Sequence, residues 1–560
     1  MADERSRWPT RLVALTTAGL VALHVTWLHL VRAGGPIDVD EASYLGLAFQ
    51  ASSPDHRILT GPFLLWTEPG YQAPLLALVT TPLHYLLGRS VEVSYLANLP
   101  FFVLLVAATY QLGRRLMSDR WAALAAIVVA TVPGIADYTR HYHFALAATA
   151  VFTAALFALV RSNRFGHRGW SMAFGLALGS VVLTRTMMLA FAPGLAVAAV
   201  VAVLSTPPAE RSGARRNLLL ALALAAVVAA SWYLFSFTDV WDYLTGFGYG
   251  SASTDYGPAA VTSLRFWLSD LVAVVSEGFY LPLTLVLVAA AAAGWFTGVR
   301  PRPSWRRLVR TDAFLVVLPL AAGAAALVSS RNTGTGFVLP LLPAAVVLAV
   351  ALTSRIRPRR AALATAAVLG VLALFNTVMK ADVIPALHDD RSIELAPWAP
   401  VRVVDGESVI DRYVRTETLP PTDEHPDGWD AANRRLLEAA MAHTPAGRDK
   451  PDVLLTLEGP LFNVPSMQLE VQRGDPPRIN VGSLDRADLD ELDDLDALTR
   501  DLAERRRRGV DQVVTGPPAL AWRGFSLPES LTSRAAAAAG YRPVEAITLP
   551  DGREVLLWSE

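Results

Sequence analysis

Long apolar segments are the feature that most constrains the fold of this chain. A membrane-spanning helix needs about 20 mostly apolar residues, and eleven such segments fall within residues 1–380. Only 18% of the 560 residues are charged, against about 25% in ordinary soluble domains. We therefore expect an all-α membrane module of about eleven helices. The predicted spans are 12–32, 93–113, 118–135, 144–161, 170–190, 190–205, 216–236, 273–296, 312–330, 336–353 and 361–379.

Arginines in the short connecting loops give the orientation of these spans. Basic residues precede the first span and fill every second loop, as one consistent topology requires under the positive-inside rule. The N-terminus is then cytoplasmic, and eleven spans place the C-terminus outside. The first span is long for a signal peptide and no small-residue cleavage site follows it, so we expect an uncleaved anchor.

One apolar stretch, residues 73–88, does not fit this count. Treating it as a span would place the loop at Arg114 outside and break the alternation of basic loops. We expect it to lie in or near the outer interface as an amphipathic or re-entrant helix. It would then belong to a long first outer loop, residues 33–92.

The charge balance divides the chain into two regions. Residues 381–560 carry 33 Asp and Glu against 20 Lys and Arg, a net charge of −13, whereas residues 1–380 carry 17 against 29, a net of +12. The basic region is expected to meet anionic membrane lipids, and the acidic region to sit in water without binding nucleic acid. The absence of cysteine excludes thiolate zinc sites, iron–sulfur clusters and cysteine nucleophiles.

Short apolar strands alternate with helical patterns in the acidic region, which predicts a small soluble α/β domain over residues 381–560. The acidic run from Asp485 to Asp496 lacks the central glycine of a calcium loop, and we interpret it as a solvated helix. No glycine-rich nucleotide-binding motif occurs in this region of the sequence. The expected strands begin at 452 and 512, a terminal hairpin flanks 551–552, and the expected helices are 429–443, 485–508 and 528–540.

Three acids, Asp38, Asp40 and Glu41, follow the first span within four residues. Ionisable groups close to the bilayer are usually functional. The alternative is that Asp38 or Asp40 caps a helix running from Glu41 to Gln50, since a carboxylate accepts the free N–H groups there. Both interpretations stay open at this point.

Three arginines fall at outer helix ends, on the side that the positive-inside rule depletes of arginine. They are Arg140, Arg185 and Arg331. Arg185 either extends along the helix to reach the interface or binds a lipid phosphate, because a guanidinium matches phosphate oxygens in a bidentate way.

These segments together resemble the GT-C glycosyltransferases of the protein O-mannosyltransferase and aminoarabinose-transferase type, which are membrane enzymes that use polyprenyl-phosphate sugars. Six pieces match in order along residues 1–350. The chain departs from the family pattern in having His141 and His143 near the place of a second-loop acid, and in lacking the lysine of a Glu-Lys-Pro-Pro stretch. The matching pieces are Asp40-Glu41-Ala-Ser-Tyr44, Glu68-Pro-Gly-Tyr-Gln-Ala-Pro74-Leu, Arg140, Gly175-Leu-Ala-Leu-Gly179 with Thr184-Arg185, Ser231-Trp232-Tyr233, and Arg331 with Leu339-Pro340-Leu-Leu-Pro343.

The resemblance implies an inverting transfer of a sugar from a polyprenyl-phosphate donor to an extracytoplasmic glycan, lipid or protein, in the bacterial plasma membrane. It implies a catalytic pair, Asp40 and Glu41, with Asp40 as general base. One of the three outer arginines would stabilise the leaving phosphate. No metal ligands are assigned, although a divalent metal held by two histidines and a carboxylate stays open. The implied substrate-binding residues are Tyr44, Glu68, Arg140, His143, Arg185 and Arg331.

A different class of function is a transporter or flippase of lipid-linked envelope precursors. Transporters place ionisable groups near the membrane midplane and often contain internal repeats. Here the ionisable residues cluster at the predicted outer face and the sequence shows no repeat, which favours the enzyme. A third possibility, an envelope anchor whose outer domain binds, does not explain the loop motifs.

Overall fold

The chain forms two compact units in a computed structural model. Unit 1 comprises Met1–Leu28, Pro62–Thr80 and Tyr95–Val409, and unit 2 comprises His29–Gly61, Thr81–Ser94 and Ile410–Glu560. This division differs from the predicted boundary at residue 381, because the segment after the last long helix belongs to unit 1 and much of the first outer loop belongs to unit 2. The described residues are 2–32, 37–55, 60–67, 70–250, 260–298, 304–330, 336–396, 399–407, 428–445, 447–448, 450–473, 479–484, 492, 494–518 and 527–560.

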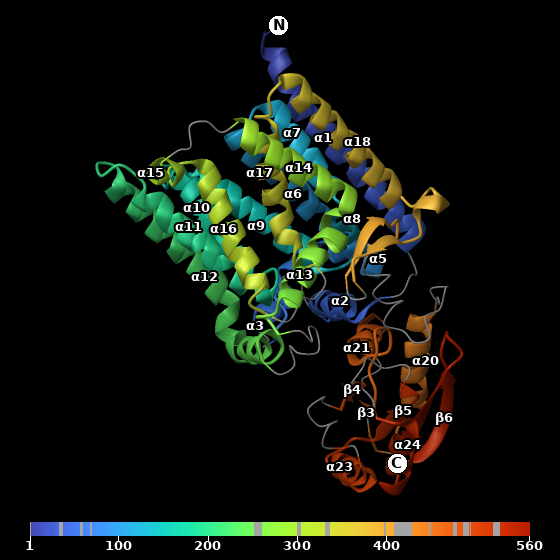
Figure 1. The fold of residues 1–560 in the computed structure, drawn as a ribbon. Helices are drawn as coiled ribbons and strands as arrows, with labels where there is room; N and C mark the ends of the chain where they lie inside the picture. The colour runs from blue at the N-terminus through green and yellow to red at the C-terminus, as the bar shows by residue number, and fades with distance from the viewer. Residues whose placement is uncertain are drawn as a thin grey trace. The chain divides into compact units, whose positions relative to one another are not determined.

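Unit 1 is a bundle of packed helices (Figure 1). α9 forms its centre, since 83% of its 18 residues are buried and both α6 and α10 pack against it. The helices are α1 (Ala2–Trp27), α6 (Asn98–Leu116), α7 (Asp119–Ala130), α8 (Pro133–Arg140), α9 (Phe144–Arg161), α10 (Arg168–Val182), η2 (Thr186–Ala190), α11 (Ala192–Leu204), α12 (Arg211–Tyr243), η3 (Leu244–Gly248), α13 (Leu264–Ala273), η5 (Val274–Phe279), α14 (Leu281–Gly298), α15 (Trp305–Leu308), α16 (Asp312–Leu327), η6 (Leu339–Leu341), α17 (Leu342–Thr353), α18 (Arg359–Lys380) and η7 (Pro385–Leu387).

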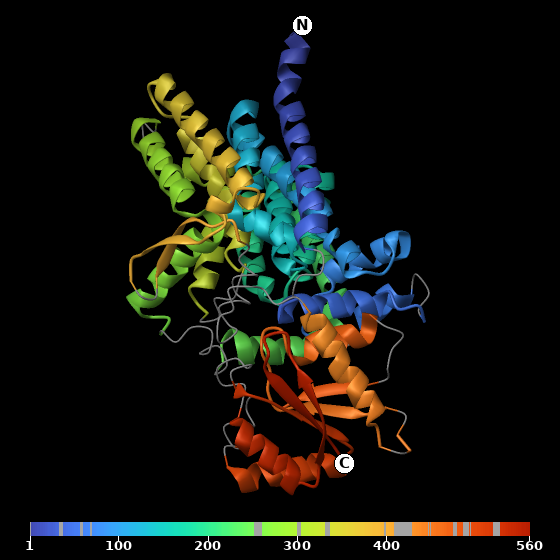
Figure 2. The same ribbon diagram turned by 90° about the vertical axis from the view of Figure 1, so that its right-hand side faces the viewer.

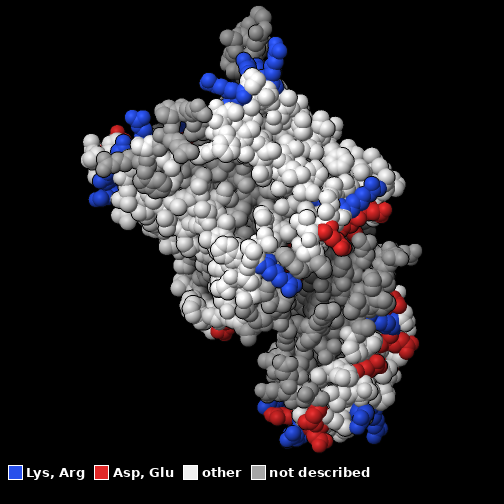
Figure 3. All heavy atoms as spheres, in the orientation of Figure 1, with Lys and Arg blue, Asp and Glu red and all other residues white. Residues whose placement is uncertain are grey.

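Seven helices in the described part of the chain are long and apolar enough to cross a membrane, or eight if the bent pair α7–α8 forms one span. The chain is therefore a multi-pass membrane protein. The predicted spans 312–330 and 336–353 coincide with shorter apolar helices, so the count of eleven stays a prediction. In Figure 3 the visible face of unit 1 carries Lys and Arg at the helix ends and few charged atoms across its middle.

Two breaks in these helices have local causes. Pro133 begins α8, and the residue before a proline is disfavoured in the α-helical region, so α7 ends just before it and the axis bends by 55°. The predicted turn between the spans 170–190 and 190–205 lies earlier than expected. α10 ends at Val182, and Arg185 adopts an extended backbone before η2 begins.

The Gly-x-x-x-Gly motif serves helix packing. A Cβ at Gly175 would lie 2.3 Å from the Ala221 carbonyl oxygen, and one at Gly179 would lie 2.7 Å from that of Ala225. The two glycines therefore let the backbones of α10 and α12 approach closely, which is the usual role of small residues in membrane helices.

Unit 1 ends in an antiparallel hairpin that the sequence did not predict, formed by β1 (Arg391–Glu394) and β2 (Pro400–Val404).

The apolar stretch predicted at 73–88 forms the helix α4 (Leu75–Leu87). In the chain it lies between the helical segments α3 (Thr60–Thr67) and α5 (Val91–Tyr95). α4 has only 13 residues, or about 20 Å of helix against the roughly 30 Å of a bilayer core. Its interfacial or re-entrant placement stays a prediction.

Unit 2 contains the predicted α/β domain (Figure 2), whose five strands lie in the order β4-β3-β5-β7-β6. The first three strands are parallel, and β7 and β6 form the predicted antiparallel terminal hairpin. Strand alternation sends Val453 and Leu455 into the core with α20 and α21, and Leu454 into the core with α23 and α24. The elements are η1 (Leu28–Arg32), α2 (Val39–Ala51), α20 (Trp429–Ala442), β3 (Asp452–Leu455), α21 (Val464–Arg473), β4 (Asn480–Ser483), α23 (Leu495–Arg507), β5 (Gln512–Thr515), α24 (Glu529–Ala538), β6 (Arg542–Thr548) and β7 (Glu554–Ser559).

Candidate active site

Asp38 begins the acidic helix α2 of unit 2. It is the N-cap residue, and its Oδ1 accepts a hydrogen bond of 2.8 Å from the Glu41 backbone N–H. A carboxylate at this position satisfies a donor that the helix leaves free and faces the positive end of the helix dipole. The capping role that the sequence left open between two acids therefore falls to Asp38, and Asp40 is not needed for it.

Glu41 forms a buried ion pair. Its Oε2 lies 2.5 Å from Nη2 of Arg32, and the two side chains are 0% and 2% exposed. Arg32 ends η1, the π-helical turn that follows α1. The arrangement gives Glu41 a charged partner inside the protein and keeps its side chain away from solvent.

Asp40 is the exposed acid of the three. It lies in the first turn of α2 between buried Asp38 and buried Glu41. Burial, and then the charges of Glu41 and Asp40, raise the pKa of Asp38 well above its usual range, against the opposing effects of the Glu41 N–H and Arg32. Tyr44 is four residues further along and shares the Asp40 face of the helix, with only 6% of its side chain exposed.

The C-terminal domain supports α2 from its other side. The Arg89 guanidinium donates to the carbonyl oxygens of Phe49 (3.0 Å) and Gln472 (2.5 Å), joining α2 to the end of α21. It also lies 4.7 Å from the centre of the Phe49 ring. Gly46 faces the same contact, since a Cβ there would lie 3.3 Å from Oε1 of Gln472. Within unit 2, the helix that carries Asp40 is thus packed against the C-terminal domain.

Arg185 of unit 1 is fixed between two aromatic rings. Its guanidinium carbon lies 3.8 Å from the centre of the Phe144 ring and 3.5 Å from that of Phe337. The side chain is 9% exposed and follows the break after α10. Cation–π contacts of this kind hold a guanidinium in place.

Several predicted motif segments converge on this arginine. The Leu75 N–H donates to the Leu183 carbonyl at 3.0 Å, and the Thr186 hydroxyl donates to the Tyr71 carbonyl. These bonds join the stretch after Glu68 to the Thr-Arg segment. Phe337 comes from the stretch between Arg331 and the Leu-Pro motif. Glu68 and Arg331 themselves lie outside the described residues.

His143 lies beside one of these rings, that of Phe144. It is the N-cap of α9, and its Nδ1 accepts a hydrogen bond of 3.2 Å from the Ala145 N–H, which assigns the proton of a neutral ring to Nε2. Its ring centre lies 3.8 Å from that of Phe144, which Arg185 also contacts. His143 is 1% exposed, so the structure places it in the support of the Arg185 region.

Arg140 belongs to a separate buried network. It donates to the carbonyl oxygen of Lys380 and to Nδ1 of His24 (3.2 Å), and its guanidinium lies 4.4 Å from the Trp27 ring centre. The Lys380 ammonium lies 2.9 Å from Oδ1 of Asp137, and both side chains are 1% exposed. This network ties α8 to the end of α18 and leaves Arg140 only 2% exposed.

Arg32 and Lys380 are the site-related residues that sequence reasoning missed. Both are basic residues at predicted outer helix ends, the same signal that singled out Arg140 and Arg185.

In the described part of the chain, no group of three or more His, Cys, Asp or Glu residues could hold a metal ion.

Sequence comparison does not place the chain: no protein-family model matches it, and no curated protein matches it. Solved structures do. ArnT from Cupriavidus metallidurans, bound to undecaprenyl phosphate, superposes with a TM-score of 0.57 at 14% identity over 98% of both chains. The chain has the GT-C glycosyltransferase fold.

Two further structures with this fold support that statement. The arabinofuranosyltransferase AftD from Mycobacteria gives a TM-score of 0.54 at 16% identity, over 98% of this chain and 40% of that one. The oligosaccharyltransferase of Archaeoglobus fulgidus, tethered to an acceptor peptide, gives 0.52 at 12% identity, over 99% and 74%. The GT-C fold therefore extends over nearly the whole chain, including the C-terminal domain in the ArnT comparison.

Proposed function

We propose that this protein is an inverting glycosyltransferase that moves a sugar from a polyprenyl-phosphate donor to an extracytoplasmic glycan, lipid or protein. The observation that carries the proposal is the fold shared over 98% of both chains with ArnT, a structure that holds undecaprenyl phosphate. We also propose that the protein lies in the bacterial plasma membrane. Its N-terminus is then cytoplasmic and its C-terminal domain lies outside.

We assign Asp40 the role of general base. It takes the proton of an acceptor hydroxyl as that oxygen attacks the anomeric carbon of the donor sugar. The new C–O bond forms as the bond to the lipid phosphate breaks, and the phosphate leaves with the bonding electron pair. A single displacement of this kind inverts the anomeric configuration. The exposure of Asp40, between the buried acids Asp38 and Glu41, supports this choice.

We assign Arg185 the role of stabilising the leaving phosphate. Negative charge grows on the phosphate as it leaves, and a preorganised guanidinium stabilises that charge more in the transition state than in the ground state. Its two ring contacts support the choice, since they hold the cation before substrate binds. Arg140 is engaged by a carbonyl, a histidine and an indole, and we assign it to supporting α8.

Glu41 and the C-terminal domain hold Asp40 in this account. Glu41 anchors the first turn of α2 through Arg32, and Arg89 joins the last turn to α21. Direct roles of Tyr44, Glu68, His143 and Arg331 in binding substrate remain part of the proposal.

The test is transfer by the purified full chain in liposomes. Radiolabelled polyprenyl-phosphate mannose and polyprenyl-phosphate arabinose would be offered with crude envelope acceptors, and a nucleotide-linked sugar would serve as the donor control. We expect label on an acceptor from a lipid-linked donor and none from the nucleotide sugar. Movement of the lipid-linked sugar between leaflets without any transfer would contradict the proposal and favour a flippase.

A further inference from the structure

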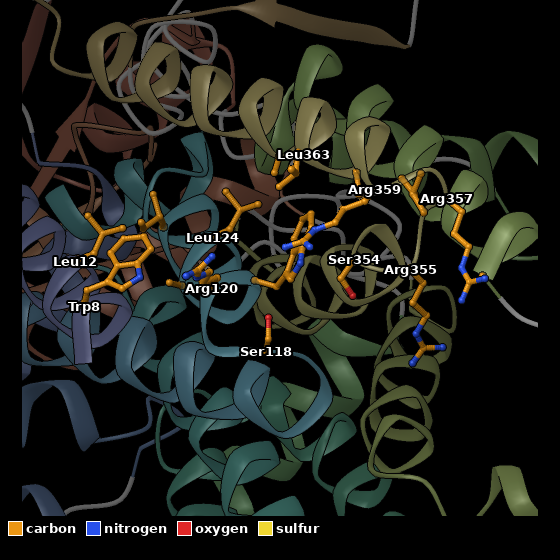
Figure 4. A pocket seen from close by; sticks show the side chains of 17 residues that line it. Trp8, Leu12, Ser118, Arg120, Leu124, Ser354, Arg355, Arg357, Arg359 and Leu363 are labelled. Atoms are coloured by element: carbon orange, nitrogen blue, oxygen red, sulfur yellow. The ribbon is translucent and has the colours of Figure 1, made fainter. Parts of the chain in front are cut away.

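A groove of about 650 Å³ opens in unit 1, and its lining includes none of the residues of the candidate active site. It lies where the start of α1, the start of α7, the end of α14 and the turn from α17 to α18 meet, and Figure 4 shows it from close by. By the predicted topology this is the cytoplasmic end of the helices. Its lining includes Trp8, Leu12, Arg120, Leu124, Arg359 and Leu363.

The mouth of the groove is positively charged. Arg120, Arg355, Arg357 and Arg359 line it, and its lining contains no Asp or Glu. The nearest acid in sequence, Asp119, pairs with Arg114 at 3.1 Å. In Figure 4 the Arg359 side chain extends toward Arg120, whereas Arg355 and Arg357 extend away from them. Arg120 and Arg359 are exposed, so an anion between them would meet two guanidinium groups from different helices.

Apart from Ser118 and Ser354, the side chains that line the rest of the groove are apolar. Leu12, Leu124, Ile127 and Leu363 continue from the arginines along helices that are apolar enough to cross a membrane, and Trp8 and Trp121 stand beside them. Tryptophan is enriched where a protein crosses from hydrocarbon to headgroups. The positive-inside rule explains arginines at this end of the helices, but it does not require them to border an apolar hollow.

We propose that this groove binds an anionic phospholipid, with its phosphate between Arg120 and Arg359 and an acyl chain along the leucines. The charge of the mouth selects an anion, and the apolar wall selects a lipid over a soluble phosphate. Basic pockets between membrane helices commonly hold anionic headgroups in this way. The inference is independent of the proposed function, because it uses none of the catalytic residues.

The test is lipid retention by the full chain. The protein would be placed in phosphatidylcholine nanodiscs with a graded fraction of phosphatidylglycerol, released, and analysed by native mass spectrometry for bound lipid. Wild type is expected to retain phosphatidylglycerol in preference to phosphatidylcholine. The double variant Arg120→Gln/Arg359→Gln is expected to retain it at least about tenfold less, since each arginine near an anionic lipid contributes on the order of a factor of five.

The matched control is Arg215→Gln/Arg216→Gln, which removes two exposed arginines at the start of α12 on the same predicted side. Retention equal to wild type in this control, with loss in the groove variant, supports the site. Equal loss in both variants would show general electrostatic attraction and overturn the proposal. Displacement of phosphatidylglycerol by millimolar inorganic phosphate would likewise contradict the proposal that the groove binds a lipid.

Discussion

Nη2 of Arg32 lies 2.5 Å from Oε2 of Glu41, with both side chains buried. The pair joins the turn that ends the first long helix to the first turn of α2. It pairs the charge of Glu41, one acid of the Asp-Glu motif, whereas the neighbouring Asp40 is exposed. A motif of two adjacent acids is thereby divided into a supporting residue and a candidate base.

Breaking this pair is expected to destabilise the protein. Glu41→Gln removes the charged partner of the buried Arg32 cation, and breaking a buried pair in this way typically costs about 3–5 kcal/mol. Arg32→Met/Glu41→Leu removes both charges and is expected to cost much less. Thermal unfolding in detergent measures both. Equal destabilisation by the single and double variants would contradict a role as an ion pair.

Asp38 gives a prediction about pH. Its folded-state pKa is raised by burial and by Glu41 and Asp40, above the value of about 3.9 in an unfolded chain. The folded form therefore disfavours the carboxylate, and stability falls as pH rises from about 4 through the folded-state pKa. Asp38→Asn keeps an oxygen for the cap and does not titrate.

We therefore expect Asp38→Asn to gain in melting temperature relative to wild type as pH is raised from 4 to 8. A melting curve series across this range measures the difference. A difference that is constant with pH, or that grows as pH falls, would contradict the raised pKa.

Arg185 is expected to be needed for transfer and not for folding. Arg185→Gln removes the cation that we propose stabilises the leaving phosphate, and loss of one such preorganised group costs about 10²–10³-fold in rate. Arg185→Lys keeps the charge but lacks the planar group that stacks on two rings, and we expect an intermediate rate. Initial rates in liposomes measure this, with Arg215→Gln as the control for removing one arginine. Wild-type rates for Arg185→Gln would exclude the role.

The absence of cysteine makes the topology testable. Ser392→Cys places a thiol on an exposed position of β1, on the predicted outer side, and Ser118→Cys places one at an exposed position before α7, on the predicted inner side. A membrane-impermeant maleimide is expected to label the first in intact cells and the second only after permeabilisation. The reverse pattern would invert the proposed orientation.

The sequence predicted those parts of the fold that depend on local pattern. The predicted apolar segments contain helices, and the terminal hairpin pairs as expected. α20 and α24 begin and end within two residues of their predicted bounds, because their apolar periodicity is regular.

The parts that it could not predict depend on contacts between distant residues. Lys380 and Asp137 are joined across 243 positions, and no local pattern links them. The Phe337 ring that holds Arg185 comes from a stretch 152 residues away. The cap was ambiguous for a different reason: Asp38 and Asp40 have equal intrinsic preference for it, and backbone geometry decided between them.

The most direct test of the account is the transfer rate of Asp40→Asn. The variant would be compared in liposomes with wild type and with Asp55→Asn, which removes an exposed acid from the same loop. We predict that Asp55→Asn transfers sugar at the wild-type rate and that Asp40→Asn is slower by about 10²–10⁴-fold, the usual contribution of a general base. Wild-type transfer by Asp40→Asn would contradict the central claim.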